Sequence, residues 1–494
     1  MIRSVRIVGS AAIVNIVLGI IRLKIFAILL GPAGVGLAGL YTNLMALSST
    51  VSGLGMGSSG VRQVARSNND ELRRSVVLKA LWLSGLGLGV LGGGTTYFLR
   101  EALAEYVMGD LQYAAGVGWL GLGVAASVAG IIFSAIPQGL QRLGDFARIN
   151  VVGNSLGSVV AVGIIWQFGA SGIPYAVICL PIGVAAVAAV TVSRLESSRK
   201  SRSDESIRSA FAEMLRFGGV MLFTSILTVG TMMAVRSAIA QRMGLDVAGY
   251  FHAAWLMSAT YISFLLSSMA ADFYPRITAA VANGADPGPI IQDQMHFGIV
   301  LAGPLVVGII AFAGPIILLL YSTEFHSAAM ILHVQVLGDL LKVLSFPLGF
   351  TLLALGESWK YMTVQLVWNL LYFGIVLSGL EQFGVVIVGV AYLASYAVSL
   401  TLTFFMVRGS IDFRPGCKLK LTAAATVGLA TVVSMLALIA SAIVGYVAGA
   451  VAIALLGAYA LHVVSSIPEV ATRRHIRRLM QIAKALRSKI LNDK

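Results

Sequence analysis

The sequence predicts an all-α integral membrane protein with about fourteen transmembrane helices, arranged as two parallel six-helix lobes around a central cavity plus two extra C-terminal helices. The first observation is composition: of the 494 residues, 58% are hydrophobic and 11% are charged, whereas soluble domains carry roughly 25% charged residues. The second is the number of long apolar runs. The third is an internal duplication, because landmarks of the first half recur in the second half at a nearly constant offset.

The apolar runs are long enough to form helices that cross a bilayer, which takes about 20 residues each. The 54 glycines are typical of membrane helices that pack through small residues. The expected spans cover residues 7–30, 37–60, 76–98, 113–136, 151–168, 172–193, 217–240, 248–273, 297–320, 330–355, 361–380, 384–407, 421–441 and 443–465.

Paired glycines mark the duplication most clearly. Gly31 and Gly36 lie five apart after one apolar run, and Gly244 and Gly249 lie five apart after another. Further matches pair Lys24 with Arg236, Arg62 with Arg276, and Pro137, Gly139, Asp145 and Arg148 with Pro347, Gly349, Glu357 and Lys360. Each copy holds six spans, an even number, so both copies enter the membrane from the same side as parallel repeats.

Basic residues are concentrated in alternate loops, which predicts that these loops and both termini are cytoplasmic. The loops in question carry Arg62, Arg66, Arg73 and Arg74, then Arg142 and Arg148, then Arg194, Arg199 and Arg208, and finally Arg408 and Arg414. The expected parts are an N-terminal lobe (1–193), a flexible cytoplasmic linker (194–215), a C-terminal lobe (216–407), two additional helices (421–465) and a basic amphipathic tail (468–494) on the inner leaflet.

The net charge of +14 does not indicate nucleic-acid binding, because the basic residues are confined to those loops and the tail. The sequence has no phosphate-binding loop of the Gly-x-x-x-x-Gly-Lys-Ser/Thr form, which excludes a built-in ATPase. The six histidines show no metal-ligand spacing. We therefore expect no cofactor and no metal, and a proton or sodium gradient is the candidate driving force.

Charged residues within spans are costly and mark functional positions. In the first lobe they are cationic: Arg22 and Lys24 lie in the first span and Arg62 ends the second, while no carboxylate precedes Asp70. Lys24 is favoured over Arg22, because Arg236 holds nearly the equivalent place in the other copy. The alternative is that these side chains extend to lipid headgroups.

The second lobe is mixed in charge. Asp272 and Arg276 are four apart, and Asp339 and Lys342 are three apart, so each pair can meet on one helix face. Either the partners neutralise one another, or Arg276 or Lys342 exchanges its carboxylate for an anionic ligand. Asp339 is also a candidate for proton uptake, and Asp272 and Asp339 are the candidate gating or ion-coupling residues.

Neutral polar residues within spans offer hydrogen bonds to a sugar or to a neighbouring helix. The sequence alone does not choose between these uses. The residues are Asn15, Asn43, Asn154, Gln335, Gln365 and Asn369.

Two stretches resemble signatures of a known family. The run from Lys24 to Gly36, with Gly-Pro-Ala-Gly-Val-Gly at its end, and the run Gln335-Val-Leu-Gly-Asp-Leu-Leu-Lys342 resemble Wzx-type polysaccharide flippases of the multidrug/oligosaccharidyl-lipid/polysaccharide exporter superfamily. The resemblance covers roughly residues 1–410. It implies a bacterial inner-membrane flippase for an undecaprenyl-pyrophosphate-linked oligosaccharide, the repeat unit of O-antigen or a related surface polysaccharide.

The resemblance agrees with the charges, because a pyrophosphate needs cationic donors when it leaves water. Arg22, Lys24, Arg62, Arg236, Arg276 and Lys342 are the candidate substrate-binding residues. Expected partners are the glycolipid and membrane lipids, with a polysaccharide polymerase and a chain-length regulator as candidate protein partners. The protein is not expected to be an enzyme.

Two other functions stay open at this point. One is a multidrug/cation antiporter of the same superfamily, although such transporters use buried carboxylates and the first lobe has none in its spans. The other is a membrane-embedded polysaccharide polymerase or glycosyltransferase, which has little reason to show two parallel halves.

Overall fold

The computed structural model describes residues 2–67, 70–194, 204–439 and 442–465, and the regular structure within those ranges is helical. Twelve segments are long and apolar enough to cross a membrane. Ser10–Gly53 has 44 residues and is broken at Gly31, and Leu143–Ser193 has 51 and contains α6 and α7, so each is long enough for two crossings of about 20 residues. Counting those two segments twice places all fourteen expected spans, and the predicted fold class of a multi-pass helical membrane protein is confirmed.

The chain divides into two compact units. Unit 1 comprises Met1–Leu256, Ile317–Ala328 and Asn369–Ile387, and unit 2 comprises Met257–Ile316, Ala329–Trp368 and Val388–Lys494. These units are defined by contacts and do not share the boundaries of the two lobes expected from the duplication. The lobe boundaries therefore stay a prediction.

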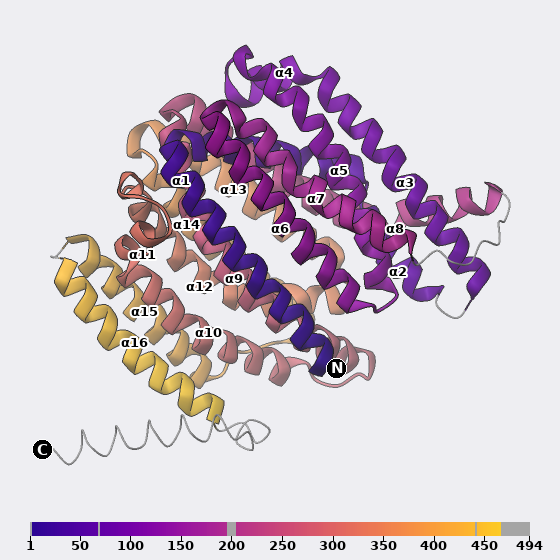
Figure 1. Ribbon diagram of the computed structural model, residues 1–494. Helices are drawn as coiled ribbons and strands as arrows, with labels where there is room; N and C mark the ends of the chain where they lie inside the picture. The colour runs from indigo at the N-terminus through magenta and orange to yellow at the C-terminus, as the bar shows by residue number, and fades with distance from the viewer. Residues whose placement is uncertain (1, 68–69, 195–203, 440–441, 466–494) are drawn as a thin grey trace, which may run out of the picture. The chain divides into compact units, whose positions relative to one another are not determined.

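Unit 1 is built around a set of long helices that pack side by side. Among them α3 packs on α5, α5 and α6 pack on α7, and α1 packs on α6 and α8, as Figure 1 shows for the helices drawn from indigo to magenta. The elements are α1 (Ile2–Gly53), α2 (Met56–Arg66), α3 (Glu71–Phe98), α4 (Arg100–Met108), η1 (Leu111–Tyr113), α5 (Ala114–Gly139), α6 (Leu143–Phe168), η2 (Gly169–Gly172), α7 (Ile173–Ser193), α8 (Asp204–Met243) and η3 (Thr323–Phe325).

Unit 2 contains the two additional helices of the chain. Both pack against α10 and against each other, and the three run together in Figure 1. The elements are α10 (Gly288–Ala311), α12 (Ala328–Ala354), α14 (Val386–Ile411), α15 (Cys417–Ile439) and α16 (Ala442–Ser465). Three more helices, α9 (Leu245–Ala282), α11 (Ala313–Leu320) and α13 (Ser358–Phe383), are divided between the units.

A break at Gly31 separates the first two expected spans. Gly31 has φ 64° and ψ −172° inside α1 and is followed by Pro32. A positive φ is costly for residues with a Cβ, and proline is tolerated where a helical segment begins. The second span ends at Gly53, earlier than expected, because Leu54 and Gly55 also have positive φ before α2 begins.

The duplicated glycines face each other within unit 1. A Cβ at Gly36 would overlap the carbonyl oxygen of Leu245, and a Cβ at Gly249 would overlap the carbonyl oxygen of Pro32. Gly244, with φ 93°, forms the turn between α8 and α9, as Gly31 does within α1. The recurrence of the two glycines therefore has a physical reason: one makes the turn, and the other allows two backbones to touch.

The second duplicated landmark is a helix end with a polar corner. After α5 the amide of Arg142 donates to the carbonyl of Pro137 at 2.8 Å, and after α12 the amide of Glu357 donates to the carbonyl of Leu352 at 2.8 Å. These six-residue hydrogen-bonded ends allow the chain to reverse with its last carbonyls satisfied. Gly356, at φ 78°, supplies the left-handed residue of the second end.

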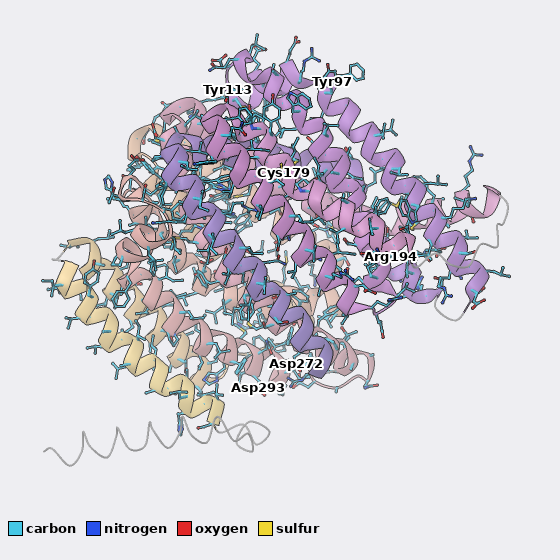
Figure 2. All side chains as sticks on the ribbon, in the orientation of Figure 1. Tyr97, Tyr113, Cys179, Arg194, Asp272 and Asp293 are labelled. Atoms are coloured by element: carbon cyan, nitrogen blue, oxygen red, sulfur yellow. The ribbon has the colours of Figure 1, made fainter. Side chains whose placement is uncertain are left out.

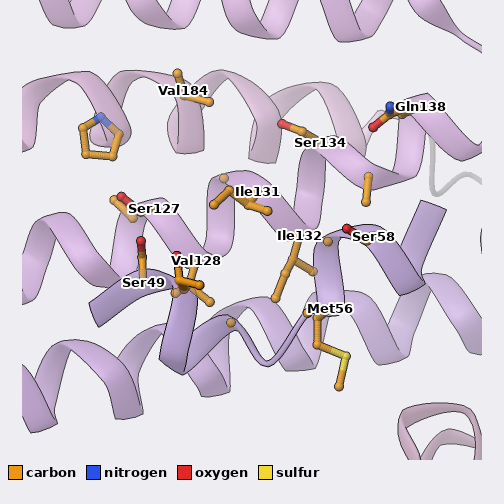
Figure 3. A pocket seen from close by; sticks show the side chains of 18 of the residues that line it. Ser49, Met56, Ser58, Ser127, Val128, Ile131, Ile132, Ser134, Gln138 and Val184 are labelled. Atoms are coloured by element: carbon orange, nitrogen blue, oxygen red, sulfur yellow. The ribbon is translucent and has the colours of Figure 1, made fainter. Parts of the chain in front are cut away.

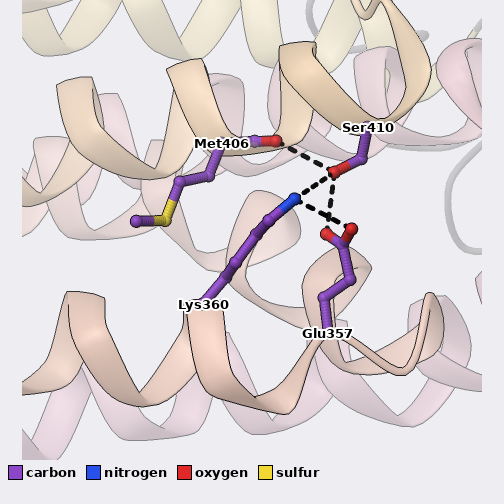
Figure 4. Close-up of polar contacts among 4 residues, drawn as sticks. All are labelled: Glu357, Lys360, Met406 and Ser410. Atoms are coloured by element: carbon purple, nitrogen blue, oxygen red, sulfur yellow. Dashed lines mark hydrogen bonds and ion pairs between the residues drawn. The ribbon is translucent and has the colours of Figure 1, made fainter.

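Around the second corner three side chains form a closed network (Figure 4). Lys360 Nζ lies 2.8 Å from Glu357 Oε1 and 2.8 Å from Ser410 Oγ, and Ser410 Oγ donates to Glu357 Oε2 at 2.7 Å. Partial burial opposes ionisation of Glu357, but the hydrogen bonds from Lys360 and Ser410 outweigh it and lower the pKa of this carboxyl group. The network ties the start of α13 to the end of α14.

Two expected boundaries need correction. The ninth span, expected at 297–320, is α10, which begins at Gly288 and ends at Ala311 before the separate helix α11. Its early turns carry Gln292, Asp293 and Gln294. These polar residues suggest a loop in the sequence, but a helix end at the membrane surface tolerates them. Residues 204–215 of the expected linker are helical in α8. Residues 195–203 and the basic tail 468–494 lie outside the described residues.

Candidate functional site

Unit 1 contains a cavity of about 770 Å³ between α1, α2, α5, α6, α7 and α8. We refer to it as the unit 1 cavity. Figure 3 shows it with α5 crossing the centre of the view. Its polar lining residues are Ser49, Thr50, Ser58, Ser127, Ser134, Gln138, Asn150, Asn154 and Ser225.

Two helices supply most of this polar lining at helical spacing. On α5, Ser127, Ser134 and Gln138 recur at intervals of seven and four residues, and on α6 Asn150 and Asn154 are four apart. Such spacings place side chains on one helix face. Each of these two otherwise apolar membrane helices therefore has one polar face, and both polar faces line the same cavity.

Several of these polar groups have no internal hydrogen-bond partner. Asn150 donates to the carbonyl of Phe146 at 2.9 Å, and Asn154 donates to Asn15 at 3.4 Å. Within the described part of the chain, Ser127, Ser134 and Gln138 have no such bond. A hydroxyl or amide that faces a cavity without a partner is available to a polar ligand.

The described residues that line the unit 1 cavity include no charged side chain. Hydroxyls and amides mixed with apolar walls suit a ligand that is rich in hydroxyl groups and neutral. Such a lining offers donors and acceptors to a sugar without the desolvation cost of a buried charge.

A second pocket, of about 520 Å³, lies where α6 begins and α7 ends. We refer to it as the α6–α7 pocket. Three arginines and one carboxylate, Arg142, Arg148, Arg194 and Asp145, lie in its lining above apolar residues of both helices. Arg194 is labelled in Figure 2.

Lys24, the favoured cation of the first span, is bonded within unit 1. Its Nζ donates to the carbonyl of Leu318 at 2.9 Å and to the carbonyl of Tyr321. These carbonyls lie at the C-terminal end of α11, where a cation is favourable to the helix dipole. Arg22 donates instead to Ser158 of α6 at 3.1 Å, so the two side chains diverge, as expected for residues two apart on a helix.

Arg236 is the deeply buried cation of unit 1, with 4% of its surface exposed. Its Nη1 hydrogen-bonds Nδ1 of His252, and its guanidinium lies 5.4 Å from the centre of the Phe251 ring. The ion pairs among the described residues do not include Arg236, and its Nε has no partner. A buried guanidinium with neutral partners retains a positive charge that an anion can compensate.

The remaining predicted cations lie in different settings. Arg62 is exposed on α2. Arg276 is exposed and pairs with Asp272, which is also exposed, at 2.8 Å. Lys342 lies 5.7 Å from the ring centre of Tyr396. None of the six predicted cations belongs to the described lining of the unit 1 cavity or of the α6–α7 pocket.

No ion pair within 4 Å joins Asp339 to Lys342 among the described residues, although the two charges act on each other. Asp339 is fully buried in α12 and accepts hydrogen bonds from three hydroxyls of unit 2. Ser258 donates at 2.7 Å, Tyr392 donates at 2.8 Å, and Tyr261 also donates. At the offset of 210 residues that separates Pro137 of α5 from Pro347 of α12, the residue that corresponds to Asp339 is Ala129, so this carboxylate has no counterpart at that place in the first copy.

The geometry of the Asp339 cluster fits a carboxylate that gains and loses a cation. Two carboxylate oxygens can accept three hydroxyl donors when the group is ionised. If the carboxyl group is protonated, one hydroxyl must turn from donor to acceptor, which a rotating O–H can do. A buried intramembrane carboxylate held in this way marks a functional position more often than a structural one.

The sequence analysis missed most of the polar residues that line the unit 1 cavity. Asn154 was recognised, but Ser127, Ser134, Gln138 and Asn150 were not. Their spacing within single spans, at intervals of four and seven residues, could have revealed them as polar faces of two helices. Arg142, Arg148 and Arg194 were recognised for topology alone, because nothing in the linear sequence shows that two helix ends bring them into one pocket.

Comparison with known proteins places this arrangement in context. A model of the polysaccharide biosynthesis protein family matches residues 25–330. The lipid III flippases of Escherichia coli (strain K12) and Shigella flexneri are each 22% identical over 400 residues, which cover 80% of this chain and 95% of those proteins.

Solved structures with the same fold are also transporters. The inward closed conformation of the lipid II flippase MurJ superposes with a TM-score of 0.70 at 13% identity, covering 93% of this chain and 98% of that one. An inward-facing multidrug resistance transporter of the MATE family, from the MOP superfamily, gives a TM-score of 0.66 at 19% identity and covers 83% of this chain and 99% of its own. These relatives are flippases and transporters rather than enzymes.

Proposed function

Because the chain belongs to the polysaccharide biosynthesis protein family, we propose that it moves an undecaprenyl-pyrophosphate-linked oligosaccharide from the cytoplasmic to the periplasmic leaflet of a bacterial inner membrane. The glycan is the repeat unit of O-antigen or of a related surface polysaccharide. The names of the lipid III and lipid II flippases among its relatives support a lipid-linked glycan as the substrate.

The observation that carries the proposal is the unit 1 cavity. A cation antiporter needs a carboxylate where its drug binds, whereas the described lining of this cavity offers Ser127, Ser134, Gln138 and Asn150 in neutral surroundings. On the predicted topology the cavity opens in the cytoplasmic half, because Gln138 and Phe146 flank the short loop that carries Arg142. That half is where a substrate made in the cytoplasm would enter.

Alternating access is the proposed mechanism, with the glycan in the unit 1 cavity and the lipid tail in the bilayer. Asp339 is the proposed coupling group, since it can exchange a proton or a sodium ion while Ser258, Tyr261 and Tyr392 follow its charge. A polysaccharide polymerase and a chain-length regulator are the proposed protein partners downstream, because the flipped unit is their substrate.

Complementation tests this function and identifies the glycan. The full-length protein is expressed in strains that each lack one polysaccharide flippase, and restored surface glycan is measured by gel and lectin binding. We expect restoration in at least one strain, and a reduction of about tenfold for Gln138→Leu, which removes an amide from the cavity; one or two lost hydrogen bonds have this effect. Gln167→Leu, an exposed glutamine on α6 outside the cavity lining, is the matched control. Equal export by the two variants would contradict the assignment of the cavity.

Lys24 and Arg236 are the proposed pyrophosphate ligands, which exchange their internal partners for phosphate oxygens during the cycle. Lys24→Ala and Arg236→Ala should abolish polysaccharide export without lowering the amount of protein in the membrane, as measured by immunoblot beside the export assay. Lys24→Arg should retain export in part, because the charge remains. Normal export by both alanine variants would remove these residues from the site.

A further inference from the structure

The α6–α7 pocket combines cations with exposed apolar surface. Its lining holds Arg148 and Arg194 together with Val152 and Val190. The two valines are 37% and 53% exposed on helices that are long enough to span the membrane. This pocket of about 520 Å³ has arginines at one end and exposed valines beside them. Such a combination suits a lipid with an anionic headgroup.

Two of the arginines are available to a ligand. Arg142 is engaged, because its Nε lies 2.6 Å from Asp145 Oδ2. Arg148 and Arg194 form neither an ion pair nor a side-chain hydrogen bond with any residue that the structure describes. Both are exposed, so the pocket retains an excess of two positive charges from its three arginines and one aspartate.

The residue that the sequence pairs with Arg148 in the second copy is engaged by internal bonds. Lys360, which corresponds to Arg148, is held by Glu357 and Ser410 in the network of Figure 4. Arg408 lies 214 residues after Arg194, at the end of α14, and is the sequence counterpart of that arginine. Both corners hold an ion pair between residues three apart, Arg142 with Asp145 and Lys360 with Glu357, whereas Arg148 and Arg194 lie beyond the first pair in the α6–α7 pocket.

The α6–α7 pocket is separate from the unit 1 cavity although both use α6. Asn150 and Asn154 face the cavity, whereas Arg148 and Val152 face the pocket. Residues two apart point to nearly opposite sides of a helix. One side of α6 thus offers hydroxyl and amide partners, and the other offers cations beside apolar surface.

We propose that the α6–α7 pocket is the entry site where the pyrophosphate of the polyprenyl carrier lipid first docks, with the isoprenoid chain along Val152 and Val190, before Lys24 and Arg236 bind the pyrophosphate later in the transport cycle. Guanidinium groups bind phosphate oxygens in bidentate fashion, and basic pockets between helix ends at the cytoplasmic surface bind lipid phosphates. A pyrophosphate presents two phosphate groups to the two available arginines, while a diacyl phospholipid presents a single diester phosphate. The identity of the carrier rests on the proposed function, whereas the docking of a lipid phosphate does not.

Binding of bare undecaprenyl pyrophosphate tests the proposal without transport. The full-length protein in detergent is titrated with this lipid, and in parallel with undecaprenyl phosphate and phosphatidylglycerol, and bound lipid is counted by native mass spectrometry. We expect the double variant Arg148→Ala/Arg194→Ala to bind undecaprenyl pyrophosphate at least about tenfold more weakly, a factor typical of losing charge-assisted contacts. Arg148→Lys/Arg194→Lys should bind with intermediate affinity, since charge remains but bidentate geometry is lost. Arg408→Ala, at the corresponding place in the second copy, should bind like the unmodified protein.

Two results would overturn the docking site. One is unchanged affinity of the double alanine variant. The other is equal affinity for phosphatidylglycerol with equal loss in that variant, which would make the pocket a general anionic-lipid site. If the lipid binds through Arg148 and Arg194 but the protein moves no lipid-linked oligosaccharide in a transport assay, the docking site stands and the proposed function fails.

Discussion

Replacement of Asp339 by asparagine should stop translocation while leaving the protein folded. Asn keeps the shape of Asp, its carbonyl still accepts hydrogen bonds, and its NH2 can donate to a hydroxyl that turns from donor to acceptor, so the hydroxyls of Ser258, Tyr261 and Tyr392 retain partners. It cannot bind a proton or balance a sodium ion, however, so the proposed cation exchange ends. We expect the initial rate of lipid-linked oligosaccharide translocation, measured in proteoliposomes with an imposed proton or sodium gradient, to fall by at least about tenfold and to lose its dependence on the gradient, as expected for an essential intramembrane carboxylate.

The matched control for this variant is Asp293→Asn. Asp293 is exposed on α10 (Figure 2) and lies outside the Asp339 cluster, so its neutralisation should leave the rate unchanged. Asp339→Leu tests stability instead of coupling. It leaves three hydroxyls without their acceptor, which costs roughly 1–3 kcal/mol for each group, so it should lower the yield of folded protein. Gradient-driven transport by Asp339→Asn at the normal rate would show that Asp339 is not the coupling group.

Gly249→Ala should strongly destabilise the folded protein, although it adds a single methyl group. The added Cβ would overlap the carbonyl oxygen of Pro32, which belongs to the backbone and cannot rotate away. Relief requires α1 and α9 to separate near the break at Gly31, and overpacking typically costs about 1–3 kcal/mol, with the upper end expected here because the obstructing atom belongs to the backbone. We expect a large fall in the temperature at which the detergent-solubilised protein loses its monodisperse peak in size-exclusion chromatography.

Gly163→Ala provides the comparison for the glycine prediction. Gly163 is a helical glycine of α6 with no atom within 4 Å of the position of an added Cβ. Alanine there should leave the protein unchanged or slightly more stable, because it lowers the entropy of the unfolded chain. Equal thermal stability of the two alanine variants would mean that α1 and α9 do not approach as closely as the structure has them.

The fold could be predicted from the sequence because its main signals are local. Apolar run length identified the spans, and glycine pairs identified the break at Gly31 and the turn at Gly244. Errors arose where a helix contains polar residues and its start cannot be found from hydrophobicity. An example is α10, whose early turns carry Gln292, Asp293 and Gln294. The recurrence of Gly36 and Gly249 suggests that each allows a close backbone contact. It does not show that the two glycines contact each other's segment.

The candidate site was less predictable because its contacts join distant residues. Lys24 reaches carbonyls 294 residues further on, and Asp339 is held by hydroxyls 81 and 53 residues away rather than by Lys342, its neighbour on the helix. Helical spacing correctly paired Asp272 with Arg276, since that contact is local. Arg148 and Arg194 form a candidate site only because α6 and α7 pack together, which charge counting along the chain does not show.

Translocation by the purified full-length protein is the most direct test of the account. Proteoliposomes are loaded with a fluorescent undecaprenyl-pyrophosphate-linked oligosaccharide of neutral sugars, and a membrane-impermeant quencher reports its arrival in the opposite leaflet. The account predicts gradient-dependent transfer by the unmodified protein and strongly reduced transfer by Gln138→Leu, with Gln167→Leu behaving as unmodified. Transfer no faster than in protein-free liposomes would contradict it.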